Sequence, residues 1–148
     1  LDALAAQSDI LLGINIVFDA KSWSWPHIES ALLQRNYVLA EDGVSFEYQV
    51  DNKTIFRTAK LDRQAPITQI TFLLEVPLVA QHYRPFELML NQAVDVAQAL
   101  QGRLVDDNGV NLTENSVGVI AQQLESLYAQ LDKSGIPAGS GTAIRLFR

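Results

Sequence analysis

The chain has 148 residues, a length that fits one domain able to bury a core without a metal or a disulfide. It contains no cysteine, which excludes thiol catalysis and zinc sites built on cysteine. Its net charge is −6 with no cluster of lysine and arginine, so we expect no nucleic-acid partner. It also lacks a signal peptide, a basic amphipathic helix and the run of about 18 apolar residues that a membrane span needs.

The composition divides the chain into three segments. Residues 1–8 are alanine-rich and are predicted to be the end of a linker. Residues 9–133 carry the apolar patterns of one folded domain, and residues 134–148 form a glycine-rich tail that does not fit the core pattern. Because the chain starts at Leu1 rather than at methionine, we expect it to be a piece of a longer protein.

The first predicted elements are a strand, a helix and a short strand. An apolar run over residues 9–18 predicts a largely buried strand. Candidate N-cap residues at 22–24, followed by Pro26, predict the start of a helix that ends near Asn36. Residues 37–40 are predicted to form a short strand.

A hairpin and one more strand are predicted next. Apolar and polar residues alternate over residues 44–50, and residues 54–61 are predicted to form a second strand, joined to the first by the turn sequence at 51–53. Residues 69–76 show the clearest alternation of the chain. Pro77 ends this strand, because proline has no N–H to donate to a sheet.

Two longer helices are predicted in the second half. Pro85 begins the first of them, and Gly102 stands where a glycine commonly ends a helix. Residues 103–105 form a short strand. Thr113 is a good N-cap for the last helix, which continues to about Lys133.

The order of these elements predicts the fold class. It reads strand, helix, three strands, helix, strand or hairpin, helix, and strands joined by short turns imply an antiparallel sheet. We therefore predict an α+β domain of the split β-α-β type with two layers. About three helices pack on one face of the sheet, and the other face is open to water.

The chain offers no set of catalytic or metal-ligating residues. His27 and His82 have no metal-ligand partner three or four residues away, and each is interpreted as a solvated side chain. Asp106 and Asp107 precede an Asn-Gly pair, which favours a turn over a catalytic carboxylate pair. No phosphate-binding loop or nucleophile elbow occurs. We therefore predict no cofactor, no metal and no enzymatic activity.

Several apolar residues are predicted to lie on the open face of the sheet. Leu73 lies opposite the core residues of its strand, beside Thr71 and Glu75. Other apolar candidates for this face are Leu11, Val44, Phe46, Tyr48 and Leu61. If these residues meet, they form an apolar strip with a polar border, which is typical of a partner site. The alternatives are scattered surface residues or burial under the tail.

The order of several short motifs resembles one known family. The motifs are Phe72-Leu73-Leu74-Glu75-Val76-Pro77, Phe86-Glu87-Leu88-Met89-Leu90, Ala97-Gln98-Ala99-Leu100-Gln101-Gly102, Val105-Asp106-Asp107 and Leu112-Thr113. In this order and spacing they resemble the FtsZ-binding C-terminal domains of the ZipA family, over about residues 9–132.

The resemblance implies a cytoplasmic domain of a bacterial cell-division protein that is anchored in the inner membrane by a segment absent from this chain. It implies a monomeric domain that binds the C-terminal peptide of FtsZ in a shallow apolar groove on the open sheet face. This binding helps to tether the Z ring to the membrane. Carried over position by position, the peptide-binding residues are Leu11, Val44, Phe46, Leu61, Arg63, Thr71 and Leu73, with Arg63 at the rim.

The chain departs from the family pattern at two points. Its one methionine, Met89, lies in a predicted helix rather than in the groove, and Leu73 stands where an aromatic residue is familiar.

Besides peptide binding, two other functions remain open, and so does the role of the tail. The open face can instead pair with a second copy of the chain, as in a ferredoxin-like oligomer without a peptide-binding role. An uncharacterised enzyme is the third possibility, although the sequence offers no catalytic residues. In the tail, residues 136–138 and 144–148 resemble elements of FtsZ tails in type, so the tail is a candidate occupant of the groove. A disordered tail or an added edge strand are the alternatives.

Overall fold

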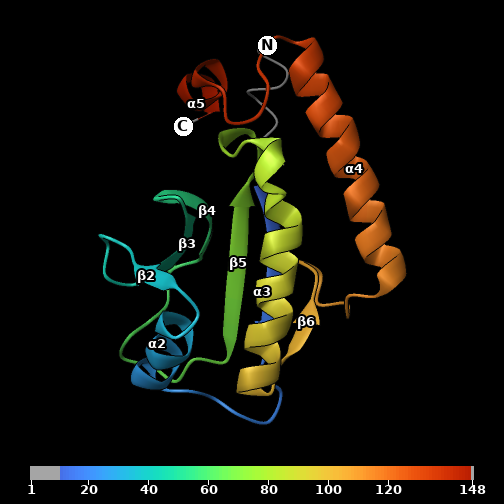
Figure 1. Cartoon of the computed structure of the whole chain (residues 1–148). Helices are drawn as coiled ribbons and strands as arrows, with labels where there is room; N and C mark the ends of the chain where they lie inside the picture. Colours follow the sequence, from blue (N-terminus) through green and yellow to red (C-terminus); the bar gives the residue numbers. More distant parts are fainter. Residues whose placement is uncertain (1–10, 148) are drawn as a thin grey trace.

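The structure is a computed structural model that describes residues 11–147. The predicted linker end and the first two residues of the predicted first strand lie outside this range. Six strands form one antiparallel sheet in the order β2-β3-β4-β5-β1-β6, and helices pack against it (Figure 1). The predicted α+β class and antiparallel sheet are confirmed.

The bounds of the elements follow the prediction closely between residues 11 and 133. The strands are β1 (Leu11–Val17), β2 (Tyr37–Leu39), β3 (Phe46–Val50), β4 (Lys53–Thr58), β5 (Gln69–Glu75) and β6 (Arg103–Val105). The helices are α2 (Trp25–Leu33), α3 (Pro85–Leu100), α4 (Glu114–Lys133) and α5 (Gly141–Phe147), with 3-10 turns η2 (Val76–Leu78) and η3 (Gln81–Tyr83). Four strands lie between α2 and α3, one for each segment predicted over residues 37–76, whereas α5 was not predicted.

One face of the sheet is buried beneath α3. The alternating residues Ile70, Phe72 and Leu74 of β5 are fully buried, as period-two alternation predicts for a strand covered on one side. Figure 1 shows α3 lying along β5 on this side of the sheet. Aromatic rings fill the same layer, since Phe56 and Phe72 meet edge to face at 5.8 Å between ring centroids.

Local capping explains where α4 begins. The Thr113 hydroxyl accepts a hydrogen bond from the Ser116 N–H at 3.1 Å, and the Ser116 hydroxyl accepts one from the Thr113 N–H at 2.7 Å. This reciprocal capping box satisfies two backbone donors that the first turn of a helix leaves unpaired. The predicted N-cap at Thr113 is confirmed.

Gly102 is required for packing rather than for a left-handed backbone. The residue that ends α3 with a positive φ is Gln101, at 60°. A Cβ on Gly102 would lie 2.5 Å from Ile16 Cγ2 and 2.8 Å from a ring carbon of Phe18. The chain after α3 therefore passes so close to β1 that no side chain fits there.

We expect Gly102→Ala to lower the free energy of unfolding by about 1–3 kcal/mol, because the added methyl overpacks a fully formed core. Gly118→Ala is the matched control, since a Cβ at Gly118, inside α4, meets nothing within 4 Å. That control should be neutral or stabilising by about 0.5–1 kcal/mol, because alanine is the better helix former. Urea denaturation of both variants measures the difference, and equal stabilities would contradict the packing argument.

Residues 134–147 of the tail are folded, and part of them packs in a cluster separate from the main core. Ile136 and Ala143 are buried with Leu131 of α4 in a small second cluster. The Gly139 N–H donates to the carbonyl oxygen of Pro77 at 2.8 Å, which ties the tail to η2. The sequence pattern did not predict this packing, because the apolar residues of the tail are buried against α4 and η2 and show no regular period of their own.

Among the helices of residues 11–147, none combines the length and the apolar composition that crossing a membrane requires.

Candidate functional site

The strand register assigns the residues of the sheet face opposite α3. Leu73 pairs with Arg57 of β4 on one side and with Gly13 of β1 on the other, so these three residues share a face. By the same register this face, which we call the open face, also carries Leu11, Asn15, Val17, Glu47, Gln69, Thr71 and Glu75.

Leu73 is a half-buried apolar residue on the open face. Beside it, Arg57 Nε and Glu75 Oε1 form an ion pair at 3.0 Å, with each side chain more than a third exposed. Such a surface pair contributes about 0–1 kcal/mol to stability, so it borders Leu73 with polar groups but adds little to the stability of the fold. Leu11, 42% exposed, pairs with Glu75 and is therefore a diagonal neighbour of Leu73.

Asn15 organises the polar end of the open face. Its side-chain oxygen accepts hydrogen bonds from the Thr71 hydroxyl at 2.6 Å and from the Gln69 amide at 3.0 Å. Its amide nitrogen donates to the Asp106 carbonyl at 3.1 Å and to Asp107 Oδ1 at 3.2 Å. Thr71, a predicted site residue, is thus held by an internal network. Sequence patterns do not reveal Asn15, because polar residues on an open sheet face are ordinary.

Phe46 and Arg63, two of the seven predicted site residues, contact Trp25 instead, and Val44 and Leu61 are hydrogen-bonded to each other. Phe46 is fully buried and stacks on Trp25 with 5.2 Å between ring centroids. The Arg63 guanidinium lies 4.5 Å from the Trp25 ring centroid. Leu61 is buried, and its N–H donates to the Val44 carbonyl at 2.8 Å. The expected position of Phe46 on the open face is therefore wrong, and these four residues do not join Leu73 in one strip.

The β3 register gives the reason for this correction. The apolar alternating set of β3 faces the helices, since Tyr48 pairs with both Tyr37 and Phe56 of the core. The polar set, which includes Glu47, then faces the open side. In a sheet covered on one face, the more apolar set of each strand is the one that is buried.

Asp42 holds the chain at the entrance to β3. Its carboxylate accepts hydrogen bonds from the Val44 N–H at 2.9 Å and from the Ser45 N–H at 3.0 Å. The Val44 N–H bond first, and then the bond from the Ser45 hydroxyl, lower the pKa of the Asp42 carboxyl by favouring its charged form. The position of Val44 is therefore set by a turn and not by packing against the open face.

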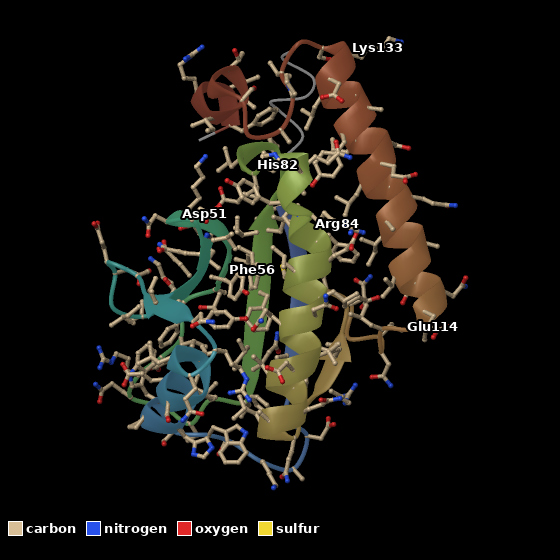
Figure 2. All side chains as sticks on the ribbon, in the orientation of Figure 1. Asp51, Phe56, His82, Arg84, Glu114 and Lys133 are labelled. Carbon is tan, nitrogen blue, oxygen red and sulfur yellow. The ribbon has the colours of Figure 1, made fainter. Side chains whose placement is uncertain are left out.

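A cavity of about 590 Å³ opens beside Leu73, between β4, β5, η2 and the tail. Its apolar lining includes Ile55, Leu78 and Ile144 along with Leu73, and Lys53 and Glu47 add charge to it. Figure 2 shows Asp51, at the tip of the β3–β4 hairpin, directed toward the same end of the molecule as the tail. Of these lining residues, sequence analysis found only Leu73. The others come from four segments that only the tertiary fold brings together.

The described residues give no metal centre. Within residues 11–147, no group of three or more histidine, aspartate or glutamate side chains is placed to hold a metal ion. His27 stacks on Trp23, and His82 packs against Tyr83. Asp106 Oδ1 accepts hydrogen bonds from the N–H groups of residues 108 and 110, which confirms its predicted part in a turn.

Comparison with known proteins adds one family. The family model described as ZipA, C-terminal FtsZ-binding domain, matches residues 36–123, which is more than half of the chain. The matched region runs from just before β2 into α4 and includes Leu73 and Arg57. It does not include β1 or the tail. A search of curated proteins found no match to the chain.

Proposed function

Because the chain belongs to the family of ZipA C-terminal FtsZ-binding domains, we propose that it binds the C-terminal peptide of FtsZ on the open face of its sheet, with Leu73 as an apolar anchor. The family is one of protein-binding cell-division domains. In this proposal a membrane anchor outside the chain holds the domain at the cytoplasmic side of the inner membrane, and binding tethers the Z ring there.

The observation that carries the proposal is the position of Leu73. It is an apolar, partly accessible side chain on a central strand, with Leu11 diagonally beside it. The ion pair of Arg57 and Glu75 borders it on one side, and the network of Asn15 borders it on the other. A few apolar anchors inside a polar rim are the usual source of binding energy in small interfaces. For a shallow face of this size we expect micromolar affinity, about −8 kcal/mol.

The other predicted site residues take different parts in this proposal. Leu11 and Thr71 flank Leu73 on the open face. Val44 and the exposed Arg63 form a second, separate contact area at the Trp25 corner. Leu61 and Phe46 lie in the interior behind that corner and support it.

We expect Leu73→Ala to weaken binding of a synthetic FtsZ C-terminal peptide by about 1–3 kcal/mol, because the substitution removes an anchor. The loss of stability should stay below about 1 kcal/mol, since Leu73 is accessible in the free domain. Val119→Ala, at an exposed valine of α4, is the control and should leave the affinity unchanged. Calorimetric titration and a thermal melt measure the two quantities on each variant.

Two outcomes would overturn the proposed function. The first is a wild-type chain that releases no heat with the peptide at high protein concentration. The second is a chain that forms a concentration-dependent dimer which Leu73→Ala disperses and the peptide does not affect. The second outcome would favour the interpretation that the open face pairs with its own copy.

A further inference from the structure

The tail lines the same cavity as the proposed anchor residue. Gly139 and Ile144 of the tail contribute to its lining, together with Leu73 of β5 and Ile55 of β4. The family match ends at residue 123, so this part of the cavity lies outside the region that the family defines. The tail therefore borders the open face beside Leu73 from outside the matched range.

The tail is held in place by close contacts at η2. The Gly139 N–H donates to the Pro77 carbonyl oxygen at 2.8 Å. Gly139 has a φ of +79°, and a Cβ built there would lie 2.4 Å from the backbone nitrogen of Ala80. Only glycine fits this backbone conformation and this approach. Farther along, the fully buried Ala143 fixes α5 against the second cluster.

The docked tail lines the cavity without filling it. The cavity keeps a volume of about 590 Å³ with Ile144 at its wall, and this volume lies in the range of ligand sites, about 300–1,000 Å³. This arrangement differs from the expectation that the tail itself occupies the groove. The hydrogen bond of Gly139 holds the tail on η2, so Ile144 forms the border of the cavity from the side.

We infer that residues 134–147 form one wall of an anchor pocket, in which an apolar side chain of the FtsZ peptide is held between Leu73 and Ile144. The inference rests on the proposed function and adds the residues that shape its site. A flat sheet face leaves an anchor exposed to water on most sides. A wall from the tail removes that water, and anchors in desolvated pockets carry most of the energy of an interface.

The apolar part of the lining indicates the kind of side chain that the pocket takes. The buried Ile55 and Leu78 of η2 both belong to this lining. Lys53 lies toward the hairpin tip, with its ammonium group 5.9 Å from the Tyr83 ring centroid. An aliphatic or aromatic side chain fits the apolar part, and the polar backbone of the peptide meets the charged rim.

A pair of glycine substitutions tests the wall. Gly139→Ala should undock the tail and weaken binding of the synthetic FtsZ peptide about tenfold. Gly135→Ala is the matched control, because Gly135 has a similar φ of +75° but a Cβ there meets nothing within 4 Å. Both changes introduce the same backbone strain, and only the first breaks the contact with η2. Hydrogen exchange across residues 134–147 reports whether the tail has left its place.

A second pair keeps the tail docked and changes only the wall. Ile144→Ala should weaken the peptide about threefold to fivefold, because it removes apolar surface from the pocket. Leu146→Ala should have no effect, since Leu146 lies on the same helix, is 39% exposed and does not line the cavity. Hydrogen exchange of the tail should be unchanged in both variants.

Different results overturn the proposed function and the wall formed by the tail. A wild-type chain that does not bind the peptide overturns the proposed function. If the wild type binds and Leu73→Ala weakens it, while Gly139→Ala and Ile144→Ala bind like the wild type, only the wall is overturned. Tighter binding by Gly139→Ala would also overturn it, because the tail would then compete with the peptide.

Discussion

Replacing Phe46 by alanine should lower the free energy of unfolding by about 3–5 kcal/mol. Phe46 is fully buried and stacks on Trp25 with 5.2 Å between ring centroids, so the smaller side chain leaves a cavity that the surrounding core fills only in part. The same substitution should change FtsZ-peptide affinity of the folded chain by no more than about twofold, since Phe46 lies on the helix-covered side of the sheet.

Leu73→Ala is the matched comparison for this experiment. It should show the opposite pattern, with a large loss of affinity and a small loss of stability. Urea denaturation measures the loss of stability, and a peptide titration below the unfolding transition measures the loss of affinity. A Phe46→Ala chain that is as stable as the wild type but no longer binds would return Phe46 to the binding site and contradict its assigned place in the core.

We expect Asn15→Asp to lower the free energy of unfolding by about 2–4 kcal/mol at pH 7. Asn15 is 95% buried, and its amide donates to Asp107 Oδ1 at 3.2 Å and to the Asp106 carbonyl at 3.1 Å. A carboxylate in its place loses both donors and brings a second negative charge against Asp107. None of the hydrogen-bond partners of Asn15 is a cation, so no positive charge among them offsets the repulsion between the two carboxylates.

The loss of stability in Asn15→Asp should depend on pH. Burial and the charge of Asp107 raise the pKa of the new carboxyl in the folded state above its unfolded value of about 3.9. The folded chain therefore holds more protons between the two pKa values, so its stability falls as pH rises through that window. At a pH below the unfolded value the carboxyl is neutral in both states, and most of the loss should disappear.

A double variant tests the cause. N15D/D107N places an amide donor opposite the new carboxylate and removes the second charge, so it should recover more than half of the stability lost at pH 7. D107N alone is the control and should be mild, because an amide oxygen can still accept the hydrogen bond from Asn15. Urea denaturation at two pH values measures all three variants. Equal losses at both pH values would rule out charge repulsion as the mechanism.

Local chemistry explains which features were predictable from sequence. Thr113 begins α4 and Pro85 begins α3 because caps and proline act within one turn of the chain. The alternation of β5 separates the buried Phe72 from the accessible Leu73, because a strand turns successive side chains to opposite faces. Each of these effects depends on residues a few positions apart. Each of these features is therefore predictable from a short stretch of the sequence.

The features that were missed depend on segments far apart in the chain. Phe46 faces the core and not Leu73, because the pairing of β3 with β4 decides which side of the hairpin is covered. Gly102 is small because it passes against Ile16, 86 positions earlier. Leu73 and Ile144 line one cavity only because the tail docks on η2.

The sequence by itself determined the α+β class, the family, the main helices and the accessible position of Leu73, since these follow from short-range pattern and from motif order. The tertiary structure decided which residues accompany Leu73. On the open face they are Arg57, Glu75 and Asn15, while Val44 and Arg63 stand at a separate corner. The physical reason is that a site on a sheet is assembled across strands, and the register between strands is set by packing of the whole core.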